Sequence, residues 1–212
     1  MKIKNLLFDL GGVIMEIRRA NCIQAFRELG MAHPENFLGE YVQAGPFQGI
    51  ENGSMTAADF HDALRPYLNP ATTDNEIDHA FQKFLIGIPS HRLNELKKLK
   101  SDGYKIYMLS NTNPIMWNGK IADEFTRDGR EGIAGYFDGV VTSFEAKVMK
   151  PAPEIFDYAC STLGIKPEET LFFDDSKDNV DAARKLGFEA VTVNPGDEFA
   201  TLLKEYNNTA TQ

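Results

Sequence analysis

Residues 6–14 read LLFDLGGVI and place one carboxylate, Asp9, directly after a run of mostly apolar residues. The run from Ile3 to Phe8 is typical of a buried strand. Open α/β sheets bind their ligands outside the carboxyl ends of their strands, so Asp9 stands where a functional acid is expected. Gly11 and Gly12 follow at once and allow the backbone to approach a partner closely. The stretch therefore predicts an α/β fold with Asp9 at its site.

Expected strands and helices alternate along the chain after residue 90. Apolar runs typical of strands cover residues 104–110, 138–143, 170–176 and 189–193, and helical spacing of apolar residues covers 91–103, 152–164 and 177–188. Such alternation is typical of a parallel sheet with crossover helices. With the strand that begins at Ile3, we expect five strands.

The segment between the first strand and residue 90 has a different pattern. Helical spacing of apolar residues covers 19–30, 56–68 and 74–85, with Thr56 and Asp74 as expected N-caps, and no convincing strand is found. We therefore expect a catalytic core formed by residues 1–16 and 90–212, and an inserted all-helical cap over 17–89. The last six residues, NNTATQ, have the composition of a disordered tail.

Length and charge narrow the classes of partner. A chain of 212 residues can bury a sizeable core, and its hydrophobic fraction of 42% is ordinary for a globular protein. The formal net charge of −9 argues against a nucleic acid or an anionic membrane as partner. An anionic substrate would have to be bound by local positive groups. The sequence carries no signal for an oligomeric state.

The cysteines and the apolar segments predict a location. Cys22 and Cys160 are too few and too far apart for a disulfide framework, which indicates a reducing, cytoplasmic compartment. The apolar stretch at the N-terminus is interrupted by Asp9 and is followed by no small-residue cleavage site, so we interpret it as a strand rather than a signal peptide. No segment approaches the roughly 20 apolar residues that span a bilayer.

Polar residues stand at the carboxyl ends of four expected strands: Asp9, Ser110 with Asn111, a lysine after the strand near residue 140, and Asp174 with Asp175. Because parallel strands share one direction, these groups should converge on one edge of the sheet. Two of the sets are acidic, which suits Mg²⁺, a hard cation that takes one or two carboxylates and keeps several waters.

Four motifs carry a resemblance to a known family. FDLGGV (8–13), LSNTN (109–113), KPAPEIF (150–156) and FFDDSKDN (172–179) occur in the order and at the spacings of the haloacid dehalogenase superfamily with a helical cap. The chain is most similar to the branch of bacterial sugar-phosphate phosphatases whose first motif reads FDLGNV or FDLGGV. The resemblance spans about residues 3–195 and implies a Rossmann-like core.

The resemblance also implies roles for residues of the core. Asp9 would attack phosphorus as the nucleophile and form an aspartyl-phosphate that water hydrolyses. The Ser110 hydroxyl and the Asn111 backbone N–H would hold the phosphoryl oxygens. Lys147 and Lys150 are the candidates for the positive group, and Lys150 is preferred because it precedes Pro151 and a helix N-terminus.

A Mg²⁺ site is implied by the same motifs. Asp175 stands where the ligating carboxylate of the family falls, with Asp9 and the backbone carbonyl of Gly11 as the other protein ligands. Asp174 would assist as a neighbour or second ligand, because two adjacent buried carboxylates need a cation to offset their repulsion. Asn179 could orient this cluster.

Gly11 departs from the usual pattern of the family's phosphatases. They carry a second aspartate, the general acid, at that position, and a positioned acid contributes about 10² to 10⁴ in rate. Three alternatives stay open: a substrate that leaves easily, a cap acid such as Glu51, or Glu16 from the segment after the first strand. We also expect Glu51 to bind substrate.

The sequence thus predicts a Mg²⁺-dependent phosphatase of a small phosphorylated metabolite, with a sugar phosphate favoured. A 2-haloacid dehalogenase is the first alternative, although that class needs no metal and typically has a tyrosine after the first Asp-x pair. A catalytically weak module that binds a phosphorylated ligand or a protein is the second alternative. Phosphomutases depend on the missing acid and are disfavoured.

Overall fold

Five parallel strands form the central sheet of the computed structural model, which describes residues 3–39 and 43–209. Their spatial order is β5-β4-β1-β6-β7, with β1 at the centre. The five strands are β1 (Asn5–Phe8), β4 (Lys105–Ser110), β5 (Gly139–Thr142), β6 (Thr170–Asp174) and β7 (Glu189–Thr192). All five lie within the segments expected from the sequence. The expected parallel α/β sheet is therefore confirmed.

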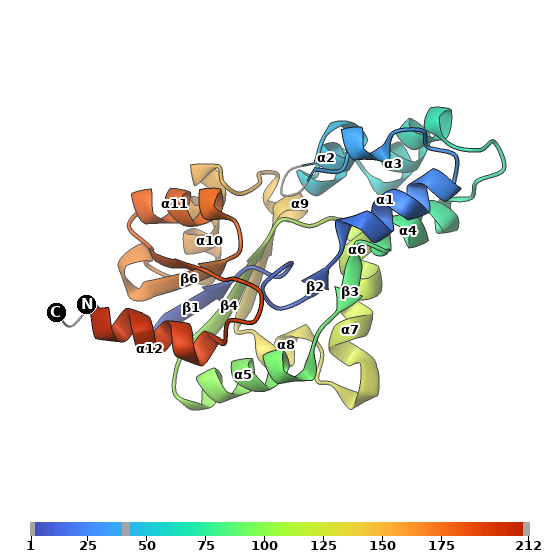
Figure 1. Cartoon of the computed structure of the whole chain (residues 1–212). Helices are drawn as coiled ribbons and strands as arrows, with labels where there is room; N and C mark the ends of the chain where they lie inside the picture. The colour runs from blue at the N-terminus through green and yellow to red at the C-terminus, as the bar shows by residue number, and fades with distance from the viewer. Residues whose placement is uncertain (1–2, 40–42, 210–212) are drawn as a thin grey trace.

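Helices cover both faces of this sheet (Figure 1). One face packs against α10 (Pro153–Leu163) and α11 (Lys177–Lys185), with Leu7 and Phe172 among its buried residues. The other face packs against α5 (Ser90–Ser101), α8 (Ile133–Tyr136) and α12 (Phe199–Thr209), with Phe8 and Phe173 stacked at a ring-centroid distance of 4.6 Å. Side chains alternate between faces along a strand, so neighbouring residues of β1 and β6 pack on opposite faces of the sheet.

Four helices after the first strand lie together beside the sheet (Figure 1). They are α1 (Arg19–Glu28), α2 (Gly45–Glu51), α3 (Ala57–Leu64) and α4 (Asp74–Gln82). Each contributes one phenylalanine to a cluster of edge-to-face and stacked rings, and these are Phe26, Phe47, Phe60 and Phe81. We call this helical body the cap. Aromatic burial of this kind lets a small unit hold its shape with few residues.

The N-caps of two cap helices follow the expectation only in part. Thr56 caps α3, and its side chain accepts a hydrogen bond from the Asp59 backbone N–H. The expected cap of α4 at Asp74 is wrong by one residue, because Thr73 forms the capping box with Glu76. A threonine can pair with a glutamate three residues later, and that reciprocal pair selects the start of the helix.

Two expectations about the ends of the cap and of the chain are wrong. Residues 17–89 do contain strand, because β2 (Glu16–Ile17) pairs antiparallel with β3 (Leu85–Gly87) and joins cap to core. The tail expected to be disordered begins inside α12, which extends to Thr209, whereas residues 210–212 lie outside the described residues. The β2–β3 pair is too short to leave a pattern in the sequence, so contacts across the chain decide it.

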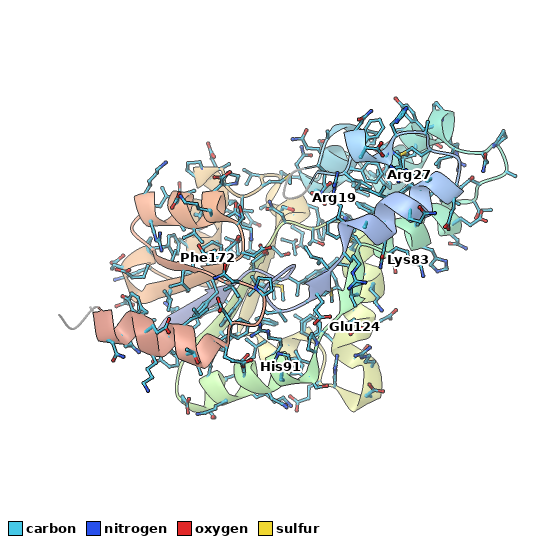
Figure 2. All side chains as sticks on the ribbon, in the orientation of Figure 1. Arg19, Arg27, Lys83, His91, Glu124 and Phe172 are labelled. Atoms are coloured by element: carbon cyan, nitrogen blue, oxygen red, sulfur yellow. The ribbon has the colours of Figure 1, made fainter. Side chains whose placement is uncertain are left out.

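A segment between β4 and β5 supports this junction. It contains α6 (Pro114–Met116), a π-helical turn (Trp117–Ile121), α7 (Ala122–Thr126) and, before α8, a 3₁₀ turn (Arg127–Gly129). Glu124 of α7, labelled in Figure 2, is buried and accepts a hydrogen bond from the Ile88 backbone N–H at 2.9 Å, while Arg130 donates to the Ile88 carbonyl at 3.2 Å. The chain is thus held on both sides of Ile88, where it leaves the cap.

The remaining elements are short. They are α9 (Ser143–Ala146) and 3₁₀ turns at Pro34–Asn36, Arg65–Tyr67 and Pro167–Glu169. Among the residues that the structure describes, no helix is long and apolar enough to cross a membrane.

Candidate active site

Asp9 lies just beyond the carboxyl end of β1, at the centre of the sheet. Its backbone N–H continues the pairing with β6 by donating to the Phe173 carbonyl at 2.8 Å. The residue is 9% exposed and lines a cavity of about 180 Å³. A carboxylate held on a paired backbone at a cavity wall is fixed in direction, as a nucleophile must be.

Lys150 links two carboxylates at this point. Its Nζ lies 2.8 Å from Asp9 Oδ1 and 2.7 Å from Asp174 Oδ2, and its side chain is almost completely buried. Burial by itself would lower the pKa of Lys150, but the two carboxylates outweigh it and raise that pKa above its ordinary value. The lysine therefore stays charged inside the protein.

Asp9 has an unusual pKa. Burial raises the pKa of Asp9 to about 7, Lys150 opposes this rise, and the charges of Asp174 and Asp175 add to it. The site thus holds more negative charge than one lysine balances. A cation or a proton is needed here.

Asn111 fixes the backbone that carries Lys150. Its side-chain Oδ1 accepts the Lys150 backbone N–H and its Nδ2 donates to the Lys150 carbonyl, both at 2.9 Å. Ser110, the last residue of β4, is buried and lines the cavity. The sequence suggested the backbone N–H of Asn111 as a substrate contact, and its side chain has a separate, structural task that the sequence did not reveal.

The two adjacent aspartates after β6 face different surroundings. Asp174 is fully buried, and its Oδ1 accepts hydrogen bonds from the Ser176 backbone N–H at 2.8 Å and the Asn179 side chain at 2.9 Å. Asp175 is half-buried and lines the cavity. Asn179 thus orients Asp174, as its position suggested. Asp175 is the acid that is accessible from the cavity.

Gly12 makes the close approach that the paired glycines suggested. Its φ is +74°, a conformation that residues with a side chain rarely adopt, and a Cβ there would lie 2.2 Å from Asp175 Oδ2. The glycine therefore lets the turn after β1 pack against the Asp175 carboxylate. Gly11 beside it lines the cavity.

The acids at this edge can hold a divalent metal. One carboxylate oxygen from each of Asp9, Asp174 and Asp175 lies within 4.8 Å of the others. All of these donors are oxygens and the local charge is negative, which fits a hard cation such as Mg²⁺. Lys150 already engages Asp174, so Asp9 and Asp175 are the better placed pair.

All seven site residues expected from the sequence line the same cavity: Asp9, Gly11, Glu51, Ser110, Asn111, Lys150 and Asp175. Glu51 comes from the cap, whereas Glu16 is exposed on β2 and does not line the cavity. Lys147, the other candidate lysine, is exposed and donates to the Gly53 carbonyl at 2.7 Å. Sequence reasoning missed Gln43, which also lines the cavity, because a lone glutamine in a cap loop carries no motif.

A family model described as haloacid dehalogenase-like hydrolase matches residues 3–187. The chain belongs to this family. The family expected from the four motifs and the expected hydrolase class are therefore confirmed.

Three relatives show how far the similarity extends. D-ribitol-5-phosphate phosphatase of Bacteroides thetaiotaomicron is 36% identical over 187 residues, which cover 88% of this chain and 90% of that protein. A crystal structure of a wild-type HAD-family enzyme from the same organism, in complex with magnesium and inorganic phosphate, has a TM-score of 0.86 at 37% identity and covers 94% and 98% of the two chains. (S)-2-haloacid dehalogenase 4A of Burkholderia cepacia is 33% identical over 53% of this chain and 48% of its own length.

Proposed function

We propose that this chain is a Mg²⁺-dependent phosphatase that hydrolyses a small phosphorylated metabolite, with sugar or polyol phosphates as the favoured class. The arrangement of Asp9, Lys150 and Asp175 in the lining of one cavity carries the proposal. A nucleophile, a fixed cation and a metal-binding acid are the groups that phosphoryl transfer needs. The phosphatase and the magnesium-bearing neighbour among its relatives support the same reaction.

Asp9 acts as the nucleophile. One carboxylate oxygen attacks phosphorus, the bond from phosphorus to the ester oxygen breaks, and the leaving oxygen takes a proton to become a hydroxyl. A water then attacks the phosphorus of the aspartyl-phosphate, and its proton is released as Asp9 and inorganic phosphate separate. Two displacement steps replace one difficult hydrolysis.

The other core residues hold charge and position. The Lys150 ammonium, 2.8 Å from Asp9 Oδ1, offsets negative charge as an anionic phosphoryl group approaches. Ser110 lies at the end of the neighbouring strand and offers its hydroxyl to a phosphoryl oxygen, and the Asn111 backbone N–H offers a second donor. Asn111 also keeps Lys150 in place through its side chain.

Asp9, Asp175 and the backbone carbonyl of Gly11 would hold Mg²⁺, and all three residues line the cavity. When bound, the ion supplies positive charge that neutralises the carboxylates and orients the phosphoryl oxygens. The buried Asp174 stays with Lys150 and Asn179 and keeps both in register with the nucleophile.

The leaving oxygen needs a proton, and Gly11 has no side chain that could donate it. Glu16 is exposed and outside the cavity lining, which removes it as a donor. Glu51 lines the cavity, and its burial raises its pKa to about 8, so it carries a proton at neutral pH. Glu51→Gln tests whether Glu51 supplies this proton.

The reducing compartment expected from the sequence stays part of the proposal. Cys22 and Cys160 are both free thiols, as a cytoplasmic enzyme would have. A dehalogenase function has less support, because that class uses no metal and three acids gather here within 4.8 Å. The matching dehalogenase of Burkholderia cepacia also shares only about half of its length with this chain.

Phosphate release from a panel of phosphorylated metabolites tests the proposal. Purified protein is assayed with Mg²⁺ or with EDTA, beside Asp9→Asn and the matched control Asp62→Asn, which alters an aspartate that is 80% exposed in the cap. We expect release that needs Mg²⁺, disappears in Asp9→Asn and is unchanged in Asp62→Asn. Release that persists in EDTA or in Asp9→Asn would refute the mechanism.

A further inference from the structure

The cap contributes two polar residues to the lining of the cavity. Among the described residues of the cap helices and the loops between them, Gln43 and Glu51 line the cavity. Apolar residues of the lining come from the junction and from the segment after β4, and they are Ile17, Phe84, Leu85, Met116 and Ile121. We call the part of the cavity lined by the acids and Lys150 the phosphoryl end.

Gln43 holds an unused acceptor. The residue is 7% exposed, and its side-chain Oε1 has no hydrogen-bond partner among the described residues. Buried polar atoms in folded proteins are nearly always hydrogen-bonded, because leaving one unpaired costs free energy. Gln43 lines the cavity, so a hydroxyl of a bound ligand can supply the donor that the described residues do not.

Glu51 adds a second polar group that is neutral rather than charged. It is 7% exposed, and its burial keeps the carboxyl protonated at neutral pH, so the carboxyl offers both a donor and an acceptor. Cys22 of α1 is the titratable neighbour whose own pKa is raised by burial and by Glu51. Two neutral polar groups suit hydroxyls better than a charged ligand.

Contacts with the core fix the place of Glu51. The Ser143 hydroxyl of α9 donates to the Glu51 carbonyl at 2.7 Å and accepts the Thr112 backbone N–H at 3.0 Å. Lys147 Nζ donates to the Gly53 carbonyl at 2.7 Å. Thr112 follows Ser110 and Asn111, so Ser143 links the end of α2 to the loop that carries the expected phosphoryl contacts.

We propose that Gln43 and Glu51 form a hydroxyl-binding subsite, so that the substrate is a phosphate ester of a short polyhydroxylated carbon chain. Gln43 Oε1 accepts a hydrogen bond from one hydroxyl, the Glu51 carboxyl pairs with another, and the apolar wall contacts the carbon chain. The cavity volume of about 180 Å³ is below the range of about 300–1,000 Å³ usual for drug-sized ligands, so the substrate is small. This inference rests on the phosphatase function proposed above.

The test compares ribitol 5-phosphate with pentyl phosphate, which has the same chain length and no hydroxyl. With wild-type protein and Mg²⁺ we expect ribitol 5-phosphate to have the higher kcat/KM. Gln43→Leu should lower that value for ribitol 5-phosphate by about 10-fold or more and leave pentyl phosphate unchanged. Glu51→Met should lower the value for ribitol 5-phosphate by at least as much. Gln24→Leu, at an exposed position in α1, is the matched control and should change neither.

Glu51→Gln separates hydroxyl binding from proton donation. The amide keeps one donor and one acceptor in the same shape, so we expect kcat/KM for ribitol 5-phosphate to recover to within a few-fold of wild type. A fall in kcat of about 10² or more on both esters would show a proton donor instead and overturn the subsite role of Glu51. Because the amide keeps the shape of the carboxyl, this variant also serves where Glu51→Met fails to fold.

The outcomes distinguish the subsite from the underlying function. Equal effects of Gln43→Leu on both esters, no effect on either, or a wild-type preference for pentyl phosphate would each overturn the subsite while the phosphatase stands. No Mg²⁺-dependent phosphate release from either ester, or from the metabolite panel, would overturn the proposed function and the subsite with it.

Discussion

The Glu51→Gln variant should become more stable than the wild type as the pH rises. The side chain is 7% exposed, and burial raises its pKa from an ordinary value of 4.5 to about 8. The folded chain therefore keeps this proton up to about pH 8, whereas the unfolded chain releases it near pH 4.5. Between these two values a rising pH favours the unfolded state, so the wild type loses stability across this window.

The size of the effect follows from one proton. Each pH unit within the window corresponds to about 1.4 kcal/mol of unfolding free energy. From pH 5 to pH 7 the wild type should therefore lose about 3 kcal/mol relative to Glu51→Gln, whose amide does not titrate. Above pH 8 the difference should level off, because both states are then deprotonated.

Urea unfolding at pH 5, 6, 7 and 8 measures this difference. The fluorescence of Trp117, the single tryptophan of the chain, and the circular dichroism should give the same transition if unfolding is two-state. EDTA is present throughout so that bound metal adds no stability of its own. Glu28→Gln, at an exposed position in α1, reports the effect of removing a negative charge from the surface. A difference between Glu51→Gln and wild type that is the same at every pH would refute the reasoning.

Three further predictions concern the acidic end of the cavity. Gly12→Ala should weaken Mg²⁺ binding and activity and lower the free energy of unfolding by about 1–2 kcal/mol. The reason is that φ is +74° and the new Cβ would lie 2.2 Å from Asp175 Oδ2. Mg²⁺ titration and urea unfolding measure these effects. Lys150→Met should lower the free energy of unfolding by about 3–5 kcal/mol in the same unfolding assay, because Asp9 and Asp174 lose their shared cation. Mg²⁺ at 100 times its Kd should stabilise the wild type by about 2.7 kcal/mol in thermal unfolding, and Asp175→Asn should lose most of that gain; an equal gain in Asp175→Asn would exclude it as a ligand.

The sheet and the phosphoryl end of the cavity could be predicted from the sequence for a simple reason. In a parallel sheet the carboxyl ends of all strands share one edge, so Asp9, Ser110 and Asp175 had to meet once their strands were identified. Lys150 followed from its place before Pro151 and a helix. None of these inferences depended on the conformation of a loop.

The features that were missed depend on such contacts. The β2–β3 pair joins Ile17 with Leu85, and two or three residues leave no periodic pattern. The polar wall of the cap depends on how a loop presents Gln43, for which no sequence signal exists. For α12 a signal was present, since Phe199 and Leu203 stand one helical turn apart and are both buried, but the polar residues that end the chain obscured it.

The adjacent Asp174 and Asp175 show why identical residues can have different roles. Their carboxylates lie within 4.8 Å of each other but have different partners, which the sequence alone does not reveal. Asp174 accepts hydrogen bonds from Ser176, Asn179 and Lys150, and so it serves to hold the lysine. Asp175 faces the cavity beside Gly12.

The charges of this cluster explain why the division matters. When ionised, the three carboxylates of Asp9, Asp174 and Asp175 carry three negative charges and Lys150 carries one positive charge, which leaves a net charge of −2. A phosphoryl dianion would be repelled by such a site, and the raised pKa of Asp9, about 7, reflects the same excess of negative charge together with burial. One divalent cation would neutralise the cluster and let Asp9 stay ionised. Lys150 supplies one positive charge to Asp9 and Asp174 together, so the charge count supports a metal ion here independently of the family.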